Sequence, residues 1–335
     1  MKATIIGAGS WGTALAVVLD SNDHDVLIWA REAEIAENIN KNNHNPTYLP
    51  DLIIPSRIQC STVLEDCLHD RDLVVFATPS HTMREVAERV KPHLSGNEIV
   101  VTVSKGIENH TYMTMTQVLV QVLDGVIIED HIGTLSGPSH AEEVARLKPT
   151  VVVSAAYSRG TAKFIQEAFM TPMFRVYVNY DVLGVEVSGA VKNIMAIAAG
   201  IVDGADLGDN IKSALITRGL FEMTRLGTQI GASRETFSGL AGIGDLIVTC
   251  TSQHSRNRYV GYHIGKGEKL QDIISRMDMI AEGVKTTKSV QGWSEKLNIE
   301  MPITDMVYRV LFEGMNPLDG MFELMTREAK DETRL

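Results

Sequence analysis

A glycine-rich turn near the N-terminus constrains this chain more than any other feature of its sequence. Residues 3–6 form a short apolar run, Gly7, Gly9 and Gly12 follow with GxGxxG spacing, and a stretch rich in Ala, Leu and Val continues to residue 19. This order is typical of a buried strand, a tight turn and a helix. Gly7 permits the turn, Gly9 lets the backbone approach a pyrophosphate, and Gly12 lets the helix pack closely on the strand. Because the N-terminal N–H groups of such a helix attract phosphates, the turn predicts a dinucleotide-binding site.

Neighbouring residues support this prediction. Residues 26–29 supply a second apolar strand at the distance expected of a βαβ unit. Ser10 and Trp11 stand where side chains or amides can touch the dinucleotide, although Trp11 could equally pack against the next loop. Tyr48 lies in an irregular loop and could close over the nucleotide or anchor that loop.

The residues after the second strand bear on which dinucleotide binds. A carboxylate at the end of this strand holds a ribose 2'-hydroxyl, whereas an arginine attracts a 2'-phosphate. Arg31 therefore favours NADP, while Glu32, one residue later, could serve NAD. A solvated pair of charges at a helix start is the alternative for both residues. NADP(H) and NAD(H) both remain candidate cofactors.

The remaining pattern predicts an α/β fold in two domains. Strand-like and helix-like segments alternate to about residue 180, which predicts an N-terminal Rossmann-type doubly wound sheet over residues 1–180. Beyond that point we expect a C-terminal all-α domain over residues 181–335, with no strand. Its expected helices cover residues 185–202, 212–230, 256–265, 270–277, 286–297 and 303–312. The first of these is apolar almost all round, as expected of a central buried helix.

Composition excludes several classes of partner. A net charge of -11 over 335 residues argues against a nucleic-acid or acidic-membrane partner. Cys60, Cys67 and Cys250 lack zinc or CxxC spacing, so we expect no metal and reduced thiols. The expected first strand follows Met1 and Lys2 directly, so we expect no signal or transit peptide. We also expect no apolar run long enough to span a bilayer. We therefore expect a cytoplasmic protein without stable membrane insertion.

Two lysines stand where chemistry could occur. Lys105 follows the strand of residues 98–103, at the carboxyl edge where open α/β sheets bind ligands. Lys192 lies among apolar residues of the long helix, and burial pushes the pKa of a lysine down toward the range useful for acid/base work. The alternative for Lys192 is a snorkelling side chain whose stem packs while its ammonium group reaches water.

The second half of the chain offers partners for these lysines. A glycine-rich turn over residues 238–245 delivers the carboxylate of Asp245. Ser255, Arg256 and Asn257 supply a hydroxyl, a guanidinium and an amide at a helix start, which suits a phosphate. The alternatives are a turn-stabilising aspartate for Asp245 and capping plus surface charge for the other three.

Taken together, these segments resemble NAD(P)-dependent glycerol-3-phosphate dehydrogenase of the bacterial type. The resemblance covers nearly the whole chain and rests on the order and spacing of motifs that are unspecific singly. These motifs are residues 7–16, 104–108, 136–141, 190–193, 240–246, 255–257 and 281–284.

The resemblance implies reduction of dihydroxyacetone phosphate to sn-glycerol 3-phosphate for phospholipid synthesis, by a homodimer acting on a small-molecule phosphate. It implies that the catalytic residues are Lys192, Lys105 and Asp245. The implied substrate contacts are Lys105, Gly137, Ser139, Lys192, Asp245, Ser255, Arg256 and Asn257. The implied cofactor contacts are Gly7, Gly9, Ser10, Trp11, Gly12, Arg31, Glu32, Tyr48, Lys105, Ala141, Arg256, Ile280 and Glu282. A dehydrogenase of the β-hydroxyacid or 6-phosphogluconate type and a non-catalytic nucleotide sensor are the alternatives.

Overall fold

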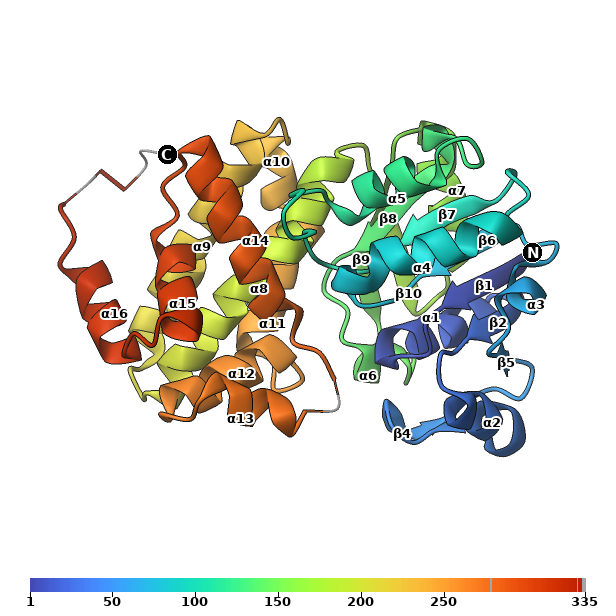
Figure 1. The fold of residues 1–335 in the computed structure, drawn as a ribbon, viewed down its shortest axis with the longest axis horizontal. Helices are drawn as coiled ribbons and strands as arrows, with labels where there is room; N and C mark the ends of the chain where they lie inside the picture. The colour runs from blue at the N-terminus through green and yellow to red at the C-terminus, as the bar shows by residue number, and fades with distance from the viewer. Residues whose placement is uncertain (278, 330, 333–335) are drawn as a thin grey trace. The chain divides into compact units, whose positions relative to one another are not determined.

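The computed structural model of the chain describes residues 1–277, 279–329 and 331–332 and contains two compact units (Figure 1). Unit 1 comprises Met1–Lys105 and Met113–Glu186, and unit 2 comprises Gly106–Tyr112 and Val187–Leu335. The short segment Gly106–Tyr112 thus leaves the first unit, packs with the second and returns. The domain boundary expected after residue 180 stays a prediction, since packing in the native structure does not show which parts fold independently.

Unit 1, all of whose residues are described, is built on an eight-stranded sheet in the order β10-β9-β8-β7-β6-β1-β2-β5. Neighbouring strands are parallel except β8 and β9, which are antiparallel. The strands of this sheet are β1 (Lys2–Ile6), β2 (Asp25–Trp29), β5 (Gln59–Ser61), β6 (Leu73–Phe76), β7 (Ile99–Thr102), β8 (Ile132–Ser136), β9 (Thr150–Ala156) and β10 (Phe174–Asn179). A separate antiparallel pair, β3 (His44–Asn45) and β4 (Leu49–Ile53), lies in the loop that was expected to be irregular.

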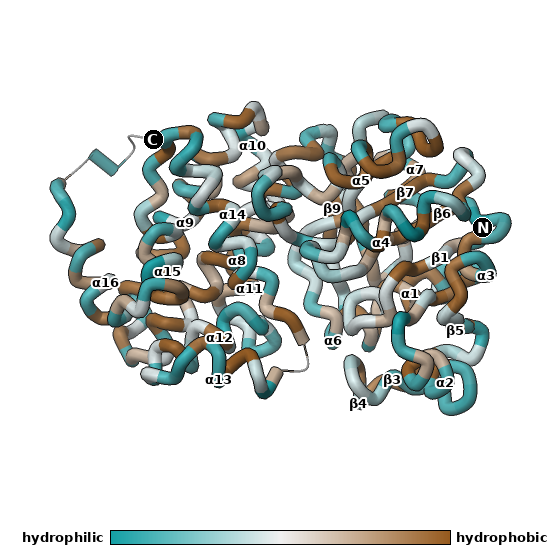
Figure 2. The backbone as a smooth tube through the Cα atoms, in the orientation of Figure 1, coloured by the Kyte–Doolittle hydropathy of each residue, from teal (hydrophilic) through white to brown (hydrophobic). Residues whose placement is uncertain are grey.

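Both faces are buried at the centre of this sheet, which explains why a central strand such as β6 is an unbroken apolar run. Ile5 of β1 belongs to one apolar core, and the adjacent Ile6 belongs to a second core. The same alternation holds for Val75 and Phe76 of β6. The brown strands of Figure 2 show this apolar centre. The helices of the unit are α1 (Ser10–Ser21), α2 (Ala33–Asn42), α3 (Leu64–Leu68), α4 (Met83–Val90), α5 (Met115–Leu123), α6 (Ala141–Val144) and α7 (Arg159–Phe169). The predicted doubly wound sheet is confirmed.

The elements of unit 2 among its described residues are helices, as predicted. They are α8 (Val182–Gly204, whose first turn falls in unit 1), α9 (Asp209–Gln229), α10 (Arg234–Phe237), α11 (Asp245–Thr251), α12 (Arg256–Gly265), α13 (Leu270–Ser275), α14 (Glu282–Leu297), α15 (Pro302–Phe312) and α16 (Pro317–Met325). Between α10 and α11 the backbone forms a π-helical turn, Leu240–Gly244, where a glycine turn was expected.

The central helix α8 corrects one expectation. Its 23 residues are long and apolar enough to cross a membrane, although we expected no such run in the chain. Its most apolar stretch is wholly buried in the protein, as in a core helix. Length and composition alone therefore do not make α8 a membrane span.

Candidate functional site

The glycine turn of unit 1 has the geometry that close approach to a ligand requires. Gly7 has a φ of +120°, and a Cβ there would lie 2.9 Å from the carbonyl oxygen of Ala77. A Cβ on Gly12 would lie 2.0 Å from the carbonyl oxygen of Gly7, so a side chain at Gly12 would push α1 away from the turn. Gly9, the N-cap of α1, has open space where its Cβ would be. The half-buried Gly9 accordingly leaves room at the point where a pyrophosphate would meet the helix N-terminus.

Side chains beside the turn hold the following loop in place. The buried Ser10 donates from Oγ to the carbonyl oxygen of Tyr48 at 2.9 Å. Asn45, fully buried, donates from Nδ2 to the carbonyl oxygen of Ala8 at 2.8 Å and to Oγ1 of Thr13 at 3.0 Å. Sequence reasoning missed Asn45, because nothing in the loop distinguishes it from its polar neighbours.

Trp11 presents a polar group without a protein partner. Its indole Nε1 is buried and has no hydrogen-bond partner within residues 1–277, 279–329 and 331–332. Since a buried donor normally finds an acceptor, this N–H is suited to a bound molecule.

Arg31 and Glu32 lie beyond the last residue of β2, and their side chains bind each other. Arg31 donates from Nε to Oε1 of Glu32 at 2.9 Å and from Nη2 at 2.5 Å. The pairing raises the pKa of Arg31. The carboxyl-terminal residues of β1 and β2, Ile6 and Trp29, are in register, so both charges lie at the carboxyl edge of the sheet. This is where the ribose of a dinucleotide binds in such folds.

The carboxyl ends of β7 and β8 bring together three more predicted residues. Lys105 donates from Nζ to the carbonyl oxygen of Gly137 at 3.0 Å, and Ser139 donates from Oγ to the same oxygen at 2.9 Å. Gly137 has a φ of +136°, which a side chain would strain. The N-cap of α6 is His140, and the buried Ala141 is the first residue of this helix.

Lys192 of unit 2 is buried in a polar cluster. It is 5% exposed, and its Nζ lies 2.6 Å from Oδ1 of Asp245 and 2.6 Å from Oγ1 of Thr249. Thr249 donates its own proton to the carbonyl oxygen of Asp245, so its hydroxyl accepts from Lys192. The snorkelling alternative is therefore wrong. Asp245 compensates a buried charge, which a mere turn-stabilising aspartate would not do.

Thr249 was missed from the sequence although a signal existed. Asp245 and Thr249 are four residues apart, and this spacing places two side chains on one face of a helix. The segment was interpreted as a turn, so the helical spacing was not applied. In the structure Asp245 is the first residue of α11, and Thr249 lies one turn later.

Helices α8 and α12 touch through their backbones. A Cβ on Gly200 of α8 would lie 2.1 Å from the carbonyl oxygen of Arg258, and a Cβ on Gly261 of α12 would lie 1.9 Å from that of Ile197. Any side chain at either glycine would separate the helices. The contact fixes the start of α12, with its candidate phosphate ligands, against the helix that carries Lys192.

The start of α12 is held by the hydrogen bonds of two residues. Ser255 is the N-cap and accepts from the backbone N of Arg258 at 3.2 Å. Asn257 donates from Nδ2 to Oδ1 of Asn193 at 3.0 Å and accepts at Oδ1 from the backbone N of Gly283 at 2.9 Å. Both ends of the Asn257 amide thus bind protein. Asn193, the residue after Lys192, is a third residue that sequence reasoning did not single out, after Asn45 and Thr249.

The last predicted residues of unit 2 lie at two helix starts. Arg256 is the first residue of α12 and is half-buried. Glu282, also half-buried, is the first residue of α14, and Ile280 precedes this helix with 40% of its surface exposed. Within unit 2, Lys192 thus binds Asp245 directly, and Asn257 binds Asn193, the residue next to Lys192.

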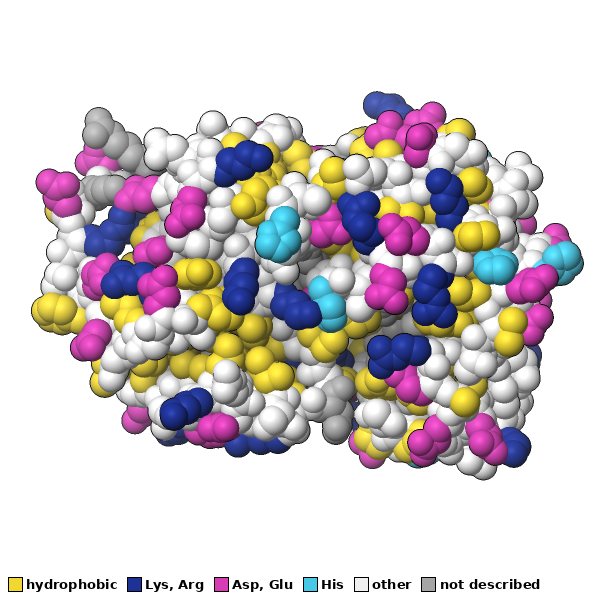
Figure 3. All heavy atoms as spheres, viewed as in Figure 1, with side chains coloured by type: hydrophobic (Ala, Val, Ile, Leu, Met, Phe, Trp, Pro, Cys, Tyr) yellow, Lys and Arg dark blue, Asp and Glu magenta, His cyan; other side chains and the backbone are white. Residues whose placement is uncertain are grey.

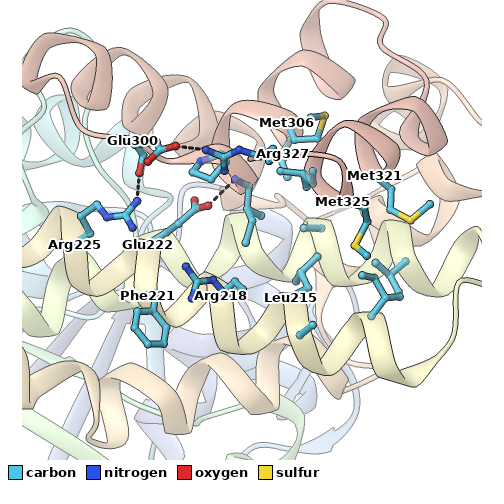
Figure 4. A pocket seen from close by; sticks show the side chains of 18 of the residues that line it. Leu215, Arg218, Phe221, Glu222, Arg225, Glu300, Met306, Met321, Met325 and Arg327 are labelled. Carbon is cyan, nitrogen blue, oxygen red and sulfur yellow. Dashed lines mark hydrogen bonds and ion pairs between the residues drawn. The ribbon is translucent and has the colours of Figure 1, made fainter. Parts of the chain in front are cut away.

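A separate pocket of unit 2 has a volume of about 1090 Å³ and lies between α8, α9, α15 and α16 (Figure 4). None of the predicted site residues lines it. The buried Glu222 faces it and accepts from the first-turn N–H groups of α15, at 2.6 Å from Ile303 and 3.2 Å from Thr304. Burial raises the pKa of Glu222 to about 7. This carboxyl group thus binds the start of α15 within unit 2.

Metal and surface features add little to the candidate site. No group of His, Cys, Asp or Glu suited to a metal ion occurs in the part of the chain that the structure describes. Burial raises the pKa of the Cys60 thiol to about 12 and of the Cys67 thiol to about 11.

Acidic and basic side chains are interspersed on the face seen in Figure 3. This face has none of the uniform positive charge that a nucleic-acid surface requires.

Comparison with known proteins bears on both units. The family described as "NAD-dependent glycerol-3-phosphate dehydrogenase N-terminus" matches residues 2–162, and its C-terminal counterpart matches residues 181–321. Over 332 residues the chain is 52% identical to NAD(P)+ glycerol-3-phosphate dehydrogenase 1 of Salinibacter ruber, with 99% of this chain and 97% of the relative covered. It is 49% identical over 332 residues to the corresponding enzyme of Chlorobium phaeobacteroides, with 99% of each covered.

A solved structure agrees with these matches. The crystal structure of glycerol-3-phosphate dehydrogenase from Coxiella burnetii has a TM-score of 0.93 and 37% identity to this chain, and covers 97% of this chain and 99% of its own. More distant likenesses, such as a ketopantoate reductase from Ralstonia eutropha with a TM-score of 0.61 and 13% identity, show the fold alone. With both halves matched and relatives at about half identity along its length, the chain belongs to the NAD-dependent glycerol-3-phosphate dehydrogenase family.

Proposed function

We propose that this chain catalyses the reversible reduction of dihydroxyacetone phosphate to sn-glycerol 3-phosphate with NADPH or NADH, supplying glycerol phosphate for phospholipid synthesis. The observation that carries the proposal is the buried Lys192–Asp245–Thr249 cluster, in a chain whose relatives are named NAD(P)+ glycerol-3-phosphate dehydrogenases. The relatives are not named for a β-hydroxyacid dehydrogenase or a nucleotide sensor, and no observation favours either alternative.

The residues of unit 1 fit a dinucleotide. The open space at Gly9, the positive φ of Gly7 and the unpartnered indole N–H of Trp11 form a cradle at the start of α1. This cradle would hold the pyrophosphate, and the bound cofactor supplies or accepts the hydride. Arg31 and Glu32 would meet the adenosine ribose. By family likeness the further cofactor contacts are Ser10, Gly12, Tyr48, Lys105, Ala141, Arg256, Ile280 and Glu282.

Lys192 is suited to proton transfer. Reduction of a carbonyl carbon leaves negative charge on its oxygen, and an ammonium group close to that oxygen donates a proton and stabilises the charge. Asp245 and Thr249 hold the Lys192 ammonium in one orientation in a nearly dry environment. Its proton then goes to the substrate oxygen, and the reverse reaction returns it. Lys105 would supply the second positive charge.

The start of α12 is suited to the substrate phosphate. Arg256 can bind two phosphate oxygens, and the first N–H groups of a ten-residue helix add donors and a favourable dipole. Binding energy from this remote group orients the reacting carbonyl. We propose that Ser255 and Asn257 shape this site and that Gly137 and Ser139 complete the substrate contacts from unit 1.

An initial-rate assay tests this function. Purified enzyme is mixed with dihydroxyacetone phosphate and either NADPH or NADH, and cofactor oxidation is followed by absorbance. Rapid oxidation that depends on dihydroxyacetone phosphate is expected with at least one cofactor. Oxidation with a β-ketoacid but not with dihydroxyacetone phosphate would contradict the proposal.

We also propose that the chain forms a homodimer in the cytoplasm, where its buried thiols would stay reduced. Helix α16 exposes Leu318 and Phe322 by 50% and 67%, and their spacing of four residues places them on one side of the helix, outside the lining of the pocket. Figure 2 shows the apolar turns of this helix. An exposed apolar stripe of this kind favours contact with a second copy. Light scattering should give twice the monomer mass, and Phe322→Glu should halve it; a wild-type monomer would refute the proposal.

A further inference from the structure

The segment Gly106–Tyr112, here called the strap, begins directly after Lys105. It belongs to unit 2 although the residues on both sides of it belong to unit 1. His110 and Tyr112 have φ values of +70° and +61°, which side-chain-bearing residues rarely adopt. Residues with side chains keep positive φ values only where surrounding contacts stabilise that conformation. The strap therefore needs strong contacts with its neighbours.

The centre of α14 provides one attachment. Ser289 is 1% exposed, and its Oγ lies 2.9 Å from the carbonyl oxygen of Ile107 and 2.5 Å from the side-chain amide of Asn109. The carbonyl oxygen of Ile107 and Oδ1 of Asn109 are both acceptors, and a hydroxyl has one proton, so Ser289 shares its proton between these two oxygens of the strap. One hydroxyl of α14 thus binds the strap two residues beyond Lys105.

Aromatic contacts provide a second attachment. The rings of Tyr112 and Trp293 are stacked with an interplanar angle of 2° and centroids 6.2 Å apart. Gly292 leaves room for them, since a Cβ there would lie 2.8 Å from the hydroxyl of Tyr112. Lys296 places its Nζ 5.6 Å from the centre of the Tyr112 ring, at a cation–π distance. Both ends of the strap are therefore fixed to α14.

The other end of α14 is connected to the helix of Lys192. The backbone N of Gly283 donates to Asn257, and Asn257 donates to Asn193, the residue that follows Lys192. A Cβ on Gly283 would lie 2.7 Å from the carbonyl oxygen of Asn193, so this end of α14 packs directly on α8. Helix α14, which is 16 residues long, thus packs against two segments. One contains Asn193, which follows Lys192, and the other is the strap, which follows Lys105.

We infer that α14 is a positioning element for the reaction and that Ser289 is a positioning residue that sets the backbone of Lys105 through the strap. The inference rests on the proposed role of Lys105 in the reaction. Ser289 itself touches neither substrate nor cofactor. A small displacement of a group that binds the reacting carbonyl lowers turnover steeply, because the reacting atoms need near-attack geometry.

The test compares two buried serines of the same helix. Ser289→Ala removes the bond to the strap, whereas Ser294→Ala removes a bond that stays within α14, from Oγ to the carbonyl oxygen of Gln291. We expect Ser289→Ala to lower kcat for dihydroxyacetone phosphate reduction about 10-fold and Ser294→Ala to leave kcat within about twofold. Urea unfolding of both variants shows whether they lose similar stability.

A double-mutant cycle with Lys105→Ala separates positioning from general loosening. If Ser289 acts through Lys105, Ser289→Ala should have little further effect on kcat/KM once Lys105 is gone. Additive losses would overturn the inference, as would equal losses of kcat in the two serine variants. Should Ser289→Ala not fold, Asn109→Ala repeats the cycle from the strap. Normal turnover of Lys105→Ala alone would refute the proposed role of Lys105 and the inference with it.

Discussion

Replacing Lys192 by methionine tests the proposed chemistry most directly. Methionine keeps an unbranched apolar side chain in the helix but removes the ammonium group. Loss of a general acid typically costs about 10²-fold to 10⁴-fold in rate, which is about 2.7–5.4 kcal/mol of transition-state stabilisation. We expect kcat for dihydroxyacetone phosphate reduction to fall within this range, while the affinity for NADPH stays within about twofold, because Lys192 is not among the proposed cofactor contacts.

The structure also predicts a stability cost for this variant. Asp245 is 1% exposed, so removing Lys192 leaves a buried carboxylate without its counter-ion. Breaking a buried pair in this way typically costs about 3–5 kcal/mol, a large part of the roughly 5–15 kcal/mol available to a folded domain. Lost activity in Lys192→Met alone would therefore be ambiguous.

A second variant resolves this ambiguity. Lys192→Met combined with Asp245→Asn removes the unpaired charge, so most of the lost stability should return while turnover should not. Both variants are measured by urea unfolding, NADPH binding and initial rates. Recovery of turnover together with stability would show that Lys192 is structural. Near-normal turnover in folded Lys192→Met would eliminate it as the acid and leave Lys105 as the candidate.

Three further predictions follow from other contacts. Arg31→Ala should weaken binding of NADPH much more than that of NADH, because only NADPH loses a charge-assisted contact; equal losses in fluorescence titrations would show that Arg31 does not read the 2'-phosphate. Because the folded state raises the pKa of Glu222 from 4.5 to about 7, its stabilising effect is complete below about pH 4.5 and is lost as the pH rises through 7. The unfolding free energy of wild type relative to Glu222→Gln should thus fall by on the order of 3 kcal/mol between pH 4.5 and 8, and a pH-independent difference would contradict this. Gly261→Ala should lower the free energy of unfolding by about 1–3 kcal/mol and raise KM for dihydroxyacetone phosphate by separating α12 from α8, whereas Gly160→Ala on α7, where a Cβ would lie 3.9 Å from Oγ of Ser158, should not; an unchanged KM in Gly261→Ala would refute the role of this contact.

The fold was predictable where burial determines the pattern. Strands with both faces buried are largely apolar, so β6 and the buried residues 3–6 of β1 stand out from the sequence. The expected helix over residues 256–265 coincides with α12. The start of α14 was placed four residues too late, because Gly283 in its first turn resembles a helix breaker. This glycine is there because Asn193 and Asn257 leave no space for a side chain, a tertiary cause that no local pattern contains.

The candidate site was predictable where a charged residue breaks an apolar pattern. Lys192 stands out for this reason, and Asp245 follows as a carboxylate after a glycine-rich stretch. Thr249, Asn193 and Asn45 do not stand out, because an ordinary polar residue becomes informative only when its partner is known. The partners of Asn193 and Asn45 lie 64 and 37 residues away in the sequence, respectively.

The energetics of the lysine cluster give a reason for its presence apart from any likeness to other enzymes. A buried ion pair is rarely more stable than apolar residues of the same volume, because desolvation of two charges offsets their attraction. Lys192 and Asp245 are both nearly inaccessible, on helices α8 and α11 that also contribute buried apolar residues such as Val191 and Leu246. A chain under no demand but stability would gain by replacing them. The cluster is therefore better explained by the reaction, which needs a positioned proton donor and a positive charge in a dry environment.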